Sequence, residues 1–99
     1  MDLRSYIFDI TMTQQPKITI YTTPGCPYCH AAKALLKKKG MAFEEIEVRD
    51  SALRQQMMLK SSGRYTVPQI FIDGLHVGGS DDMHELDRHG QLDPLLQPA

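Results

Sequence analysis

KITIYTTPGCPYCHAAKALLKKKG, residues 17–40, decides the fold, because it passes from a strand pattern through a turn into a helix pattern. Its first five residues alternate in polarity and are rich in β-branched and aromatic side chains, which predicts a strand over 17–21. Apolar residues then recur at helical spacing from about residue 26 to residue 39, and Gly40 is placed to end the helix. The helix face expected to be buried carries Cys29, Ala32, Leu35 and Leu36.

A second strand and a second helix are predicted next. Residues 43–48 alternate apolar side chains with glutamates, as a half-buried strand does. Asp50 or Ser51 can cap a helix that runs to about Ser61, and Gly63 closes it. A strand, a crossover helix and a second strand of this kind form a parallel pair.

Residues 69–78 predict a β-hairpin. The apolar run 69–72 is followed by Asp73-Gly74 and then by a second short run over 76–78. Asp-Gly is a strong hairpin signal, because the tight turns of hairpins need residues that tolerate positive φ. The hairpin therefore adds antiparallel strands to the parallel pair.

Two helices complete the predicted order. Ser80 or Asp81 can cap a third helix that runs to about His89, and a short final helix is expected over 92–96. The order is then β-α-β-α-β-β-α around a central four-stranded mixed sheet. The sequence thus predicts an α/β fold.

The composition limits the classes of protein to consider. The 99 residues suffice for one domain, and the shares of hydrophobic residues (41%) and charged residues (23%) are those of an ordinary globular protein. The formal net charge of −1 argues against binding to nucleic acid or to a membrane surface, because both need a concentrated basic face. No stretch reaches the roughly 20 apolar residues that a membrane span requires. Nothing in the sequence demands more than a monomer.

Residues 1–16 differ in character from the rest of the chain, and we interpret them as a mobile N-terminal extension of a domain that covers residues 17–97. The apolar cluster over 6–8 is too short for a secretory signal and is interrupted by Asp9. We therefore expect a cytoplasmic location, where thiols are kept reduced. Two cysteines three positions apart then indicate chemistry and not a structural disulfide.

Cys26-Pro27-Tyr28-Cys29 carries the chemistry. A cysteine at the start of a helix faces free backbone N–H groups and the positive end of the helix dipole, and both stabilise a thiolate. The thiolate is the attacking species, so the sequence assigns Cys26 as the nucleophile. Cys29 follows one helical turn later, where it can attack a mixed disulfide on Cys26 and release the product.

Three other interpretations of the cysteine pair compete with redox chemistry. A structural zinc site would need two further ligands, and His30, His76, His84 and His89 form no pair with finger-like spacing. Residues 26–30 also match the C-x-x-C-H pattern of covalent haem attachment, which is typical of exported, mainly helical chains. Two buried small hydrophobic residues would not require the Pro-Tyr insert or the turn position. The sequence favours redox chemistry, and we expect no metal.

Two further motifs indicate that a peptide binds near the cysteines. Thr66-Val67-Pro68 precedes the hairpin, and a cis proline there would present the backbone of Val67 for β-type pairing with an extended peptide such as glutathione. As a simpler alternative, Pro68 only begins a strand. Residues 78–82, Gly-Gly-Ser-Asp-Asp, allow close backbone approach and offer helix N–H groups to a carboxylate, or else form only a hairpin exit and a helix cap.

Taken together, residues 17–96 resemble the glutaredoxin family, and within it the small bacterial dithiol members. The matching features are the Cys26-Pro27-Tyr28-Cys29 site, Thr66-Val67-Pro68, Gln69-Ile70-Phe71-Ile72, and Gly78-Gly79 with Asp81-Asp82. The resemblance implies a thioredoxin-like fold and reducing power drawn from glutathione. It also implies an enzyme that reduces protein disulfides and glutathionylated proteins, through Cys26 and Cys29.

The resemblance also implies which residues contact glutathione. Tyr28 would lie beside it, Val67 would pair with its cysteine, and Gln55 would contact its glycine carboxylate. The γ-glutamyl end would be held by residues of the glycine-rich turn. The complete expected set is Tyr28, Gln55, Thr66, Val67, Pro68, Gly79, Ser80, Asp81 and Asp82.

One position departs from the family pattern. Many relatives carry a lysine three residues before the first active-site cysteine, whereas this chain has Thr23. That difference predicts weaker glutathione affinity or a less stabilised thiolate. Two rival functions remain open: a glutaredoxin-like protein reduced by a flavoprotein thioredoxin reductase, and an iron–sulfur module in which two protomers share a cluster through Cys26 and glutathione.

Overall fold

The computed structural model describes residues 15–97, and these form a three-layer α/β domain. Its strands are β1 (Ile18–Thr22), β2 (Glu44–Glu47), β3 (Gln69–Ile72) and β4 (Leu75–Gly78). Its helices are α2 (Pro27–Lys38), α3 (Ser51–Lys60), α4 (Ser80–Arg88) and α5 (Leu92–Leu96). The element order and the α/β class predicted from the sequence are confirmed.

The four strands form one mixed sheet in the order β2-β1-β3-β4. β1 pairs in parallel with β2, with Thr22 opposite Glu47. β3 is antiparallel to both β1 and β4. The crossover through α2 and the hairpin after Ile72 therefore produce the predicted sheet.

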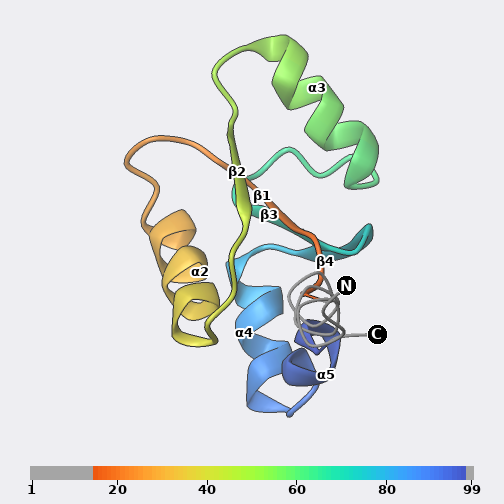
Figure 1. Cartoon of the computed structure of the whole chain (residues 1–99). Coiled ribbons are helices and arrows are strands. Elements are labelled where there is room, and N and C mark those ends of the chain that lie inside the picture. The colour runs from red at the N-terminus through yellow and green to blue at the C-terminus, as the bar shows by residue number, and fades with distance from the viewer. Residues whose placement is uncertain (1–14, 98–99) are drawn as a thin grey trace, which may run out of the picture.

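The two faces of the sheet bury different helices because the side chains of a strand alternate in direction. One core joins β1 and β3 to α2, α4 and α5; its buried members are Ile18, Ile20, Ala32, Leu35, Leu36, Ile70, Ile72, Met83, Leu92 and Leu96. A smaller cluster on the other face joins Tyr21 and Phe71 to Met57 of α3. Figure 1 shows α3 on one side of the sheet and the remaining helices on the other.

One helix end differs from the sequence prediction, and another is confirmed. The N-cap of α4 is Gly79, not Ser80 or Asp81, and the Asp82 carboxylate accepts a hydrogen bond from the backbone N–H of Gly79 at 2.8 Å. An acidic residue at the third helical position supplies that bond in the manner of a capping box. At the end of α3, Gly63 closes the helix as predicted: it has positive φ (90°), and its backbone N–H donates to the carbonyl oxygen of Met58 at 2.8 Å. Ser62, the residue before it, also has positive φ (56°).

The predicted extension over 1–16 lies outside the described residues except for its last two positions. Gln15 exchanges side-chain hydrogen bonds with the backbone N–H and carbonyl of Ala42, at 3.1 and 3.2 Å. Pro16 is buried. The domain boundary at residue 17 remains a prediction.

Candidate active site

Cys26 lies at the junction between β1 and α2. It is the N-cap of α2, with φ −87° and ψ 112°, and Pro27 takes the first helical position, where its missing N–H costs no helical bond. The sulfur therefore faces the open N–H groups of the first helical turn. The predicted position of Cys26 at a helix N-terminus is confirmed.

The two cysteine side chains differ in exposure and in hydrogen bonding. The backbone N–H of Cys29 donates to the sulfur of Cys26 across 3.1 Å. The Cys26 thiol in turn lies 3.9 Å from the carbonyl oxygen of Val67, a distance within reach of a weak S–H donor. Both residues are free thiols; Cys26 is half-buried, and Cys29 is only 1% exposed. A substrate can thus reach the sulfur of Cys26 directly, whereas the sulfur of Cys29 lies one helical turn further along and is buried.

Burial determines the protonation state of Cys29. Burial raises the pKa of the Cys29 thiol from 9.0 to about 12, and the hydrogen bond with the Cys26 side chain contributes to this rise. The backbone of Thr23 and the charge of Lys33 lower the same pKa by smaller amounts. Cys29 is therefore a neutral thiol at neutral pH, and it needs help to attack a disulfide.

A hollow of about 140 Å³ opens beside Cys26 and collects residues from three segments of the chain. The first segment is the start of α2, the second precedes β3, and the third runs from the end of β4 into α4. The lining residues are Tyr28, Arg64, Thr66, Val67, Pro68, Gly79, Ser80, Asp81 and Asp82. The structure thus brings together eight of the nine residues that the resemblance assigned to glutathione.

The segment before β3 is held by a buried amide. Gln69 has no exposed surface, and its side-chain NH₂ group donates to the carbonyl oxygen of Thr66 at 3.0 Å. Its side-chain oxygen contacts Nε2 of His76 at 2.7 Å. The Val67–Pro68 bond is cis, as the resemblance implied. These contacts fix the backbone that faces both Cys26 and the hollow.

Arg64 is a residue of the hollow that the sequence analysis did not single out. Its guanidinium forms an ion pair with Asp82 at 3.0 Å. The hydrogen bond from the backbone N–H of Gly79, followed by Arg64, holds the pKa of the Asp82 carboxyl below its usual value. The available signal was a cation placed two residues before Thr66, close to the motif predicted to pair with an extended peptide.

Gln55 is the expected contact that the structure does not bring into this hollow. It lines a separate hollow of about 450 Å³ along α3, with Met58, Leu59, Ser62 and Gly63. Its assignment to the glycine carboxylate of glutathione remains a prediction.

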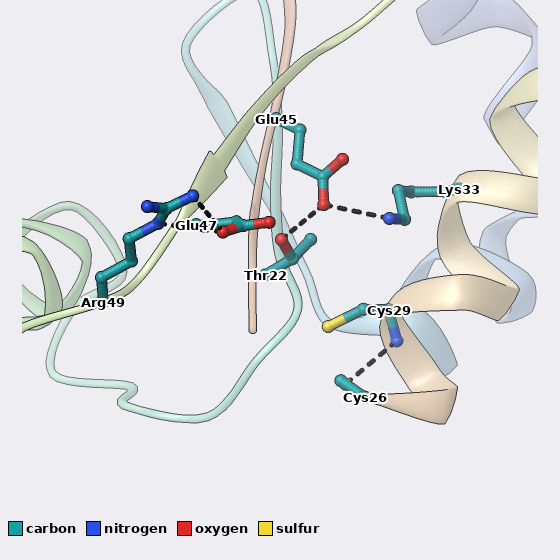
Figure 2. Close-up of polar contacts among 7 residues, drawn as sticks. All are labelled: Thr22, Cys26, Cys29, Lys33, Glu45, Glu47 and Arg49. Atoms are coloured by element: carbon teal, nitrogen blue, oxygen red, sulfur yellow. Dashed lines mark hydrogen bonds and ion pairs between the residues drawn. The ribbon is translucent and has the colours of Figure 1, made fainter. Parts of the chain in front are cut away.

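A polar network joins β1, β2 and α2, and its lysine lies one helical turn after Cys29. Oε2 of Glu45 accepts a hydrogen bond from Oγ1 of Thr22 at 2.6 Å and forms an ion pair with Nζ of Lys33 at 3.0 Å. Figure 2 shows Glu45 reaching from β2 between Thr22 and Lys33, with the two cysteines at the start of α2. The hydrogen bonds from Thr22 and then from Lys33 lower the pKa of the Glu45 carboxyl.

Two properties of the described residues bear on other functions. Residues 15–97 contain no group of three or more histidine, cysteine, aspartate or glutamate side chains arranged to hold a metal ion. Within the same range, each helix is too short or too polar to cross a membrane.

The sequence of the chain matches known proteins over most of its length. The family model described as Glutaredoxin matches residues 18–77, which include both cysteines and the segment 66–68. Glutaredoxin 3 of Escherichia coli (strain K12) is 55% identical over 80 residues, which are 81% of this chain and 96% of that protein.

Solved structures match the fold as well. The solution structure of glutaredoxin from Brucella melitensis has a TM-score of 0.75 at 50% identity, and the match covers 85% of this chain and 91% of that one. The crystal structure of a buckwheat glutaredoxin–glutathione complex has a TM-score of 0.73 at 30% identity, and the match covers 95% of this chain and 89% of that one.

Proposed function

The chain belongs to the glutaredoxin family of thiol–disulfide oxidoreductases, and we propose that it takes its reducing power from glutathione. The observation that carries the proposal is the shared position of Val67. Its carbonyl oxygen lies 3.9 Å from the Cys26 sulfur, and the same residue lines the hollow. A peptide paired with the backbone of Val67 would therefore hold its own sulfur close to Cys26. The buckwheat glutaredoxin–glutathione complex supports this assignment by likeness.

The charges around the hollow suit a peptide with two carboxylates and one ammonium group. Arg64 supplies a cation, and the N-terminus of α4 offers backbone N–H groups to a carboxylate. Asp82 is already engaged by Gly79 and Arg64. We therefore assign the γ-glutamyl ammonium to Asp81, and to Asp82 the role of holding the turn. Tyr28, which is 63% exposed, would cover the bound peptide.

The reaction on a glutathionylated protein needs only Cys26. Its thiolate attacks the glutathione sulfur of the mixed disulfide, the bond to the client protein breaks, and the client leaves as a thiol. A second glutathione then attacks the glutathione on Cys26 and departs as glutathione disulfide. Cys26 is regenerated as a thiolate.

Reduction of a protein disulfide also needs Cys29. Cys26 first forms a mixed disulfide with the client, and Cys29 then attacks Cys26 and expels the client's second thiol. The resulting Cys26–Cys29 disulfide is reduced by two glutathione molecules. Cys29→Ser is thus expected to keep the reduction of glutathionylated proteins and to lose most of the reduction of protein disulfides. An equal loss of both activities would contradict this division of labour.

We further propose that the protein acts as a cytoplasmic monomer on disulfide-bonded and glutathionylated clients. The motif and the fold support the client classes, since the same thiol chemistry serves both. We place the protein in the cytoplasm because a dithiol site needs a reducing compartment, which keeps Cys26 and Cys29 as free thiols.

The proposed function is tested by turnover of a glutathione mixed disulfide with glutathione, glutathione reductase and NADPH. We expect activity in the parent protein and none in Cys26→Ser. A parallel assay with thioredoxin reductase and NADPH alone distinguishes the first rival function. Anaerobic iron and sulfide reconstitution distinguishes the second, for which a coloured, glutathione-containing dimer is expected. Turnover with thioredoxin reductase only, or a stable cluster without turnover, would overturn the proposal.

A further inference from the structure

Lys33 is fixed on the same face of α2 as the buried cysteine. It follows Cys29 by four residues, so the two side chains lie one above the other along the helix. Its Nζ is held at 3.0 Å by Glu45 of β2, and Glu45 is held at 2.6 Å by Thr22 of β1. Thr22 is only 1% exposed, so this chain of contacts ties the Lys33 ammonium to the rigid sheet.

The thiol of Cys29, one helical turn before Lys33, is difficult to ionise. Burial, followed by the Cys26 side chain, raises the pKa of Cys29, and the charge of Lys33 lowers it by a smaller amount. The side chain of Lys33 is about one-fifth exposed (20%), so solvent screens its charge less than at an open surface. Thr23 also lowers the pKa of Cys29, through its backbone.

Glu45 is poorly suited to remove the proton itself. Thr22 and Lys33, and more weakly the charge of His30, lower the pKa of its carboxyl, so it stays ionised and is a weak base. Its position between Thr22 and Lys33 instead suits a residue that fixes the direction of the ammonium group (Figure 2).

We propose that Lys33, held by Glu45 and Thr22, is a positioning residue for the resolving step, in which it stabilises the negative charge that develops on Cys29. This inference rests on the proposed function, since it concerns the second half of the dithiol reaction. In that step the Cys29 sulfur forms a bond to the Cys26 sulfur, and the bond from Cys26 to the bound thiol breaks. The leaving thiolate carries away the electron pair and takes up the proton that Cys29 loses, so the step needs no further reactant.

The size of the effect follows from thiol chemistry. Loss of the cation is expected to raise the pKa of Cys29 and therefore to lower the fraction of Cys29 that is thiolate. The remaining thiolate becomes more nucleophilic, but with a Brønsted slope of about 0.4–0.5 this gain offsets only about half of the loss on a logarithmic scale. The resolving step should therefore slow by about twofold to threefold at a fixed pH, and its pH profile should move to higher pH.

The test separates the two chemical steps in time. Reduced protein is mixed with excess glutathione disulfide, quenched with acid at short intervals, and analysed by intact mass for the glutathione adduct and for the internal disulfide. The proteins compared are the parent, Lys33→Gln, Lys33→Arg, and Lys37→Gln as a matched control one turn further along α2. A second series uses 2-hydroxyethyl disulfide, which has no glutathione moiety.

We expect Lys33→Gln to form the adduct at the parental rate but to accumulate it, because conversion to the internal disulfide is slower and shifted to higher pH. Lys33→Arg should retain most of the parental rate, and Lys37→Gln all of it. Parental conversion with an unshifted pH profile in Lys33→Gln would overturn the inference, as would equal slowing of both steps. Failure with glutathione disulfide alone would count against the proposed function, while the 2-hydroxyethyl series would still test Lys33.

Discussion

The backbone N–H of Cys29 donates a hydrogen bond to the sulfur of Cys26 across 3.1 Å, within the first turn of α2. The same helical turn therefore stabilises the outer sulfur and carries the inner sulfur on the buried side of the helix. Cys26 is half-buried, whereas Cys29 is buried. The order of the reaction follows from this arrangement: the outer thiol attacks the substrate, and the inner thiol acts only after a mixed disulfide has formed.

Iodoacetamide is expected to alkylate Cys26 and to spare Cys29 in the reduced, folded protein below about pH 9. Burial raises the pKa of Cys29 to about 12, so very little of it is thiolate in that range. Folding therefore favours the neutral form of Cys29. This contribution to the free energy of unfolding is fully present below the ordinary pKa of 9.0 and is lost as the pH rises toward 12. Peptide mapping after timed alkylation checks the site, with urea-unfolded protein as the control. Equal labelling of both cysteines at neutral pH would contradict it.

Arg64→Gln is expected to raise the KM for glutathione by about threefold to tenfold and to change kcat little, because a charge-assisted contact to a carboxylate contributes about 1 kcal/mol. The substitution also removes the ion pair with Asp82. Steady-state kinetics with varied glutathione measure the effect. Arg88→Gln, at the far end of α4, is the matched control, and an unchanged KM in Arg64→Gln would remove Arg64 from the binding site.

Gly78→Ala is expected to destabilise the protein more than Gly74→Ala. Both glycines have positive φ, at +115° and +82°, so alanine is strained at either position, by about 1 kcal/mol. Only at Gly78 does the added Cβ meet other atoms: it would come within 2.8 Å of Cγ of Asp82 and 2.9 Å of the Arg64 guanidinium. Urea unfolding should give a further loss of about 1–2 kcal/mol at Gly78, together with a raised KM for glutathione. Equal losses of unfolding free energy in the two variants would mean that the side chains of Asp82 and Arg64 move aside at no cost.

Thr23→Lys is expected to lower the KM for glutathione by about twofold to fivefold, since a partly exposed cation near a carboxylate contributes up to about 1 kcal/mol. The prediction follows from the lysine that the family resemblance leads us to expect at this position. Thr23→Gln, which adds length without charge, is the control. If both variants bind glutathione as the parent does, then the arginine of the hollow already meets this need.

The sequence predicted the parts of the fold that local patterns specify. The alternation of polar and apolar residues predicted β1, and the 3.6-residue period of apolar residues predicted the buried face of α2. The dipeptide Asp73-Gly74 predicted the hairpin between β3 and β4. The N-cap of α4 was predicted wrongly, because Ser80 is a good cap by residue type. The choice of Gly79 depends on Asp82 reaching back to its N–H.

The site was predictable where it follows motifs and not where it depends on tertiary placement. Thr66, Val67 and Pro68 lie in one motif, and the fold brings them to the hollow beside Cys26. Arg64 follows a turn after α3 in which both Ser62 and the predicted stop Gly63 have positive φ. No local pattern indicates that conformation in a serine.

The pairing of Lys33 with Glu45 could not be predicted from the sequence for a related reason. It depends on the parallel register that sets Ile20 of β1 opposite Glu45 of β2, and on the rotation of α2 against the sheet. A strand pattern predicts that alternate side chains share a face. It does not predict which of several glutamates meets a given lysine on a neighbouring helix.

The most direct test of the central claim is to trap the first intermediate. Cys29→Ser is incubated with a glutathionylated protein, quenched with acid, and mapped by peptide mass spectrometry, beside Cys26→Ser treated in the same way. We predict one glutathione on Cys26 in the first variant, formed as fast as the client thiol is released, and none on Cys29 in the second. Client release without glutathione on Cys26, or equal transfer to Cys29, would contradict the account.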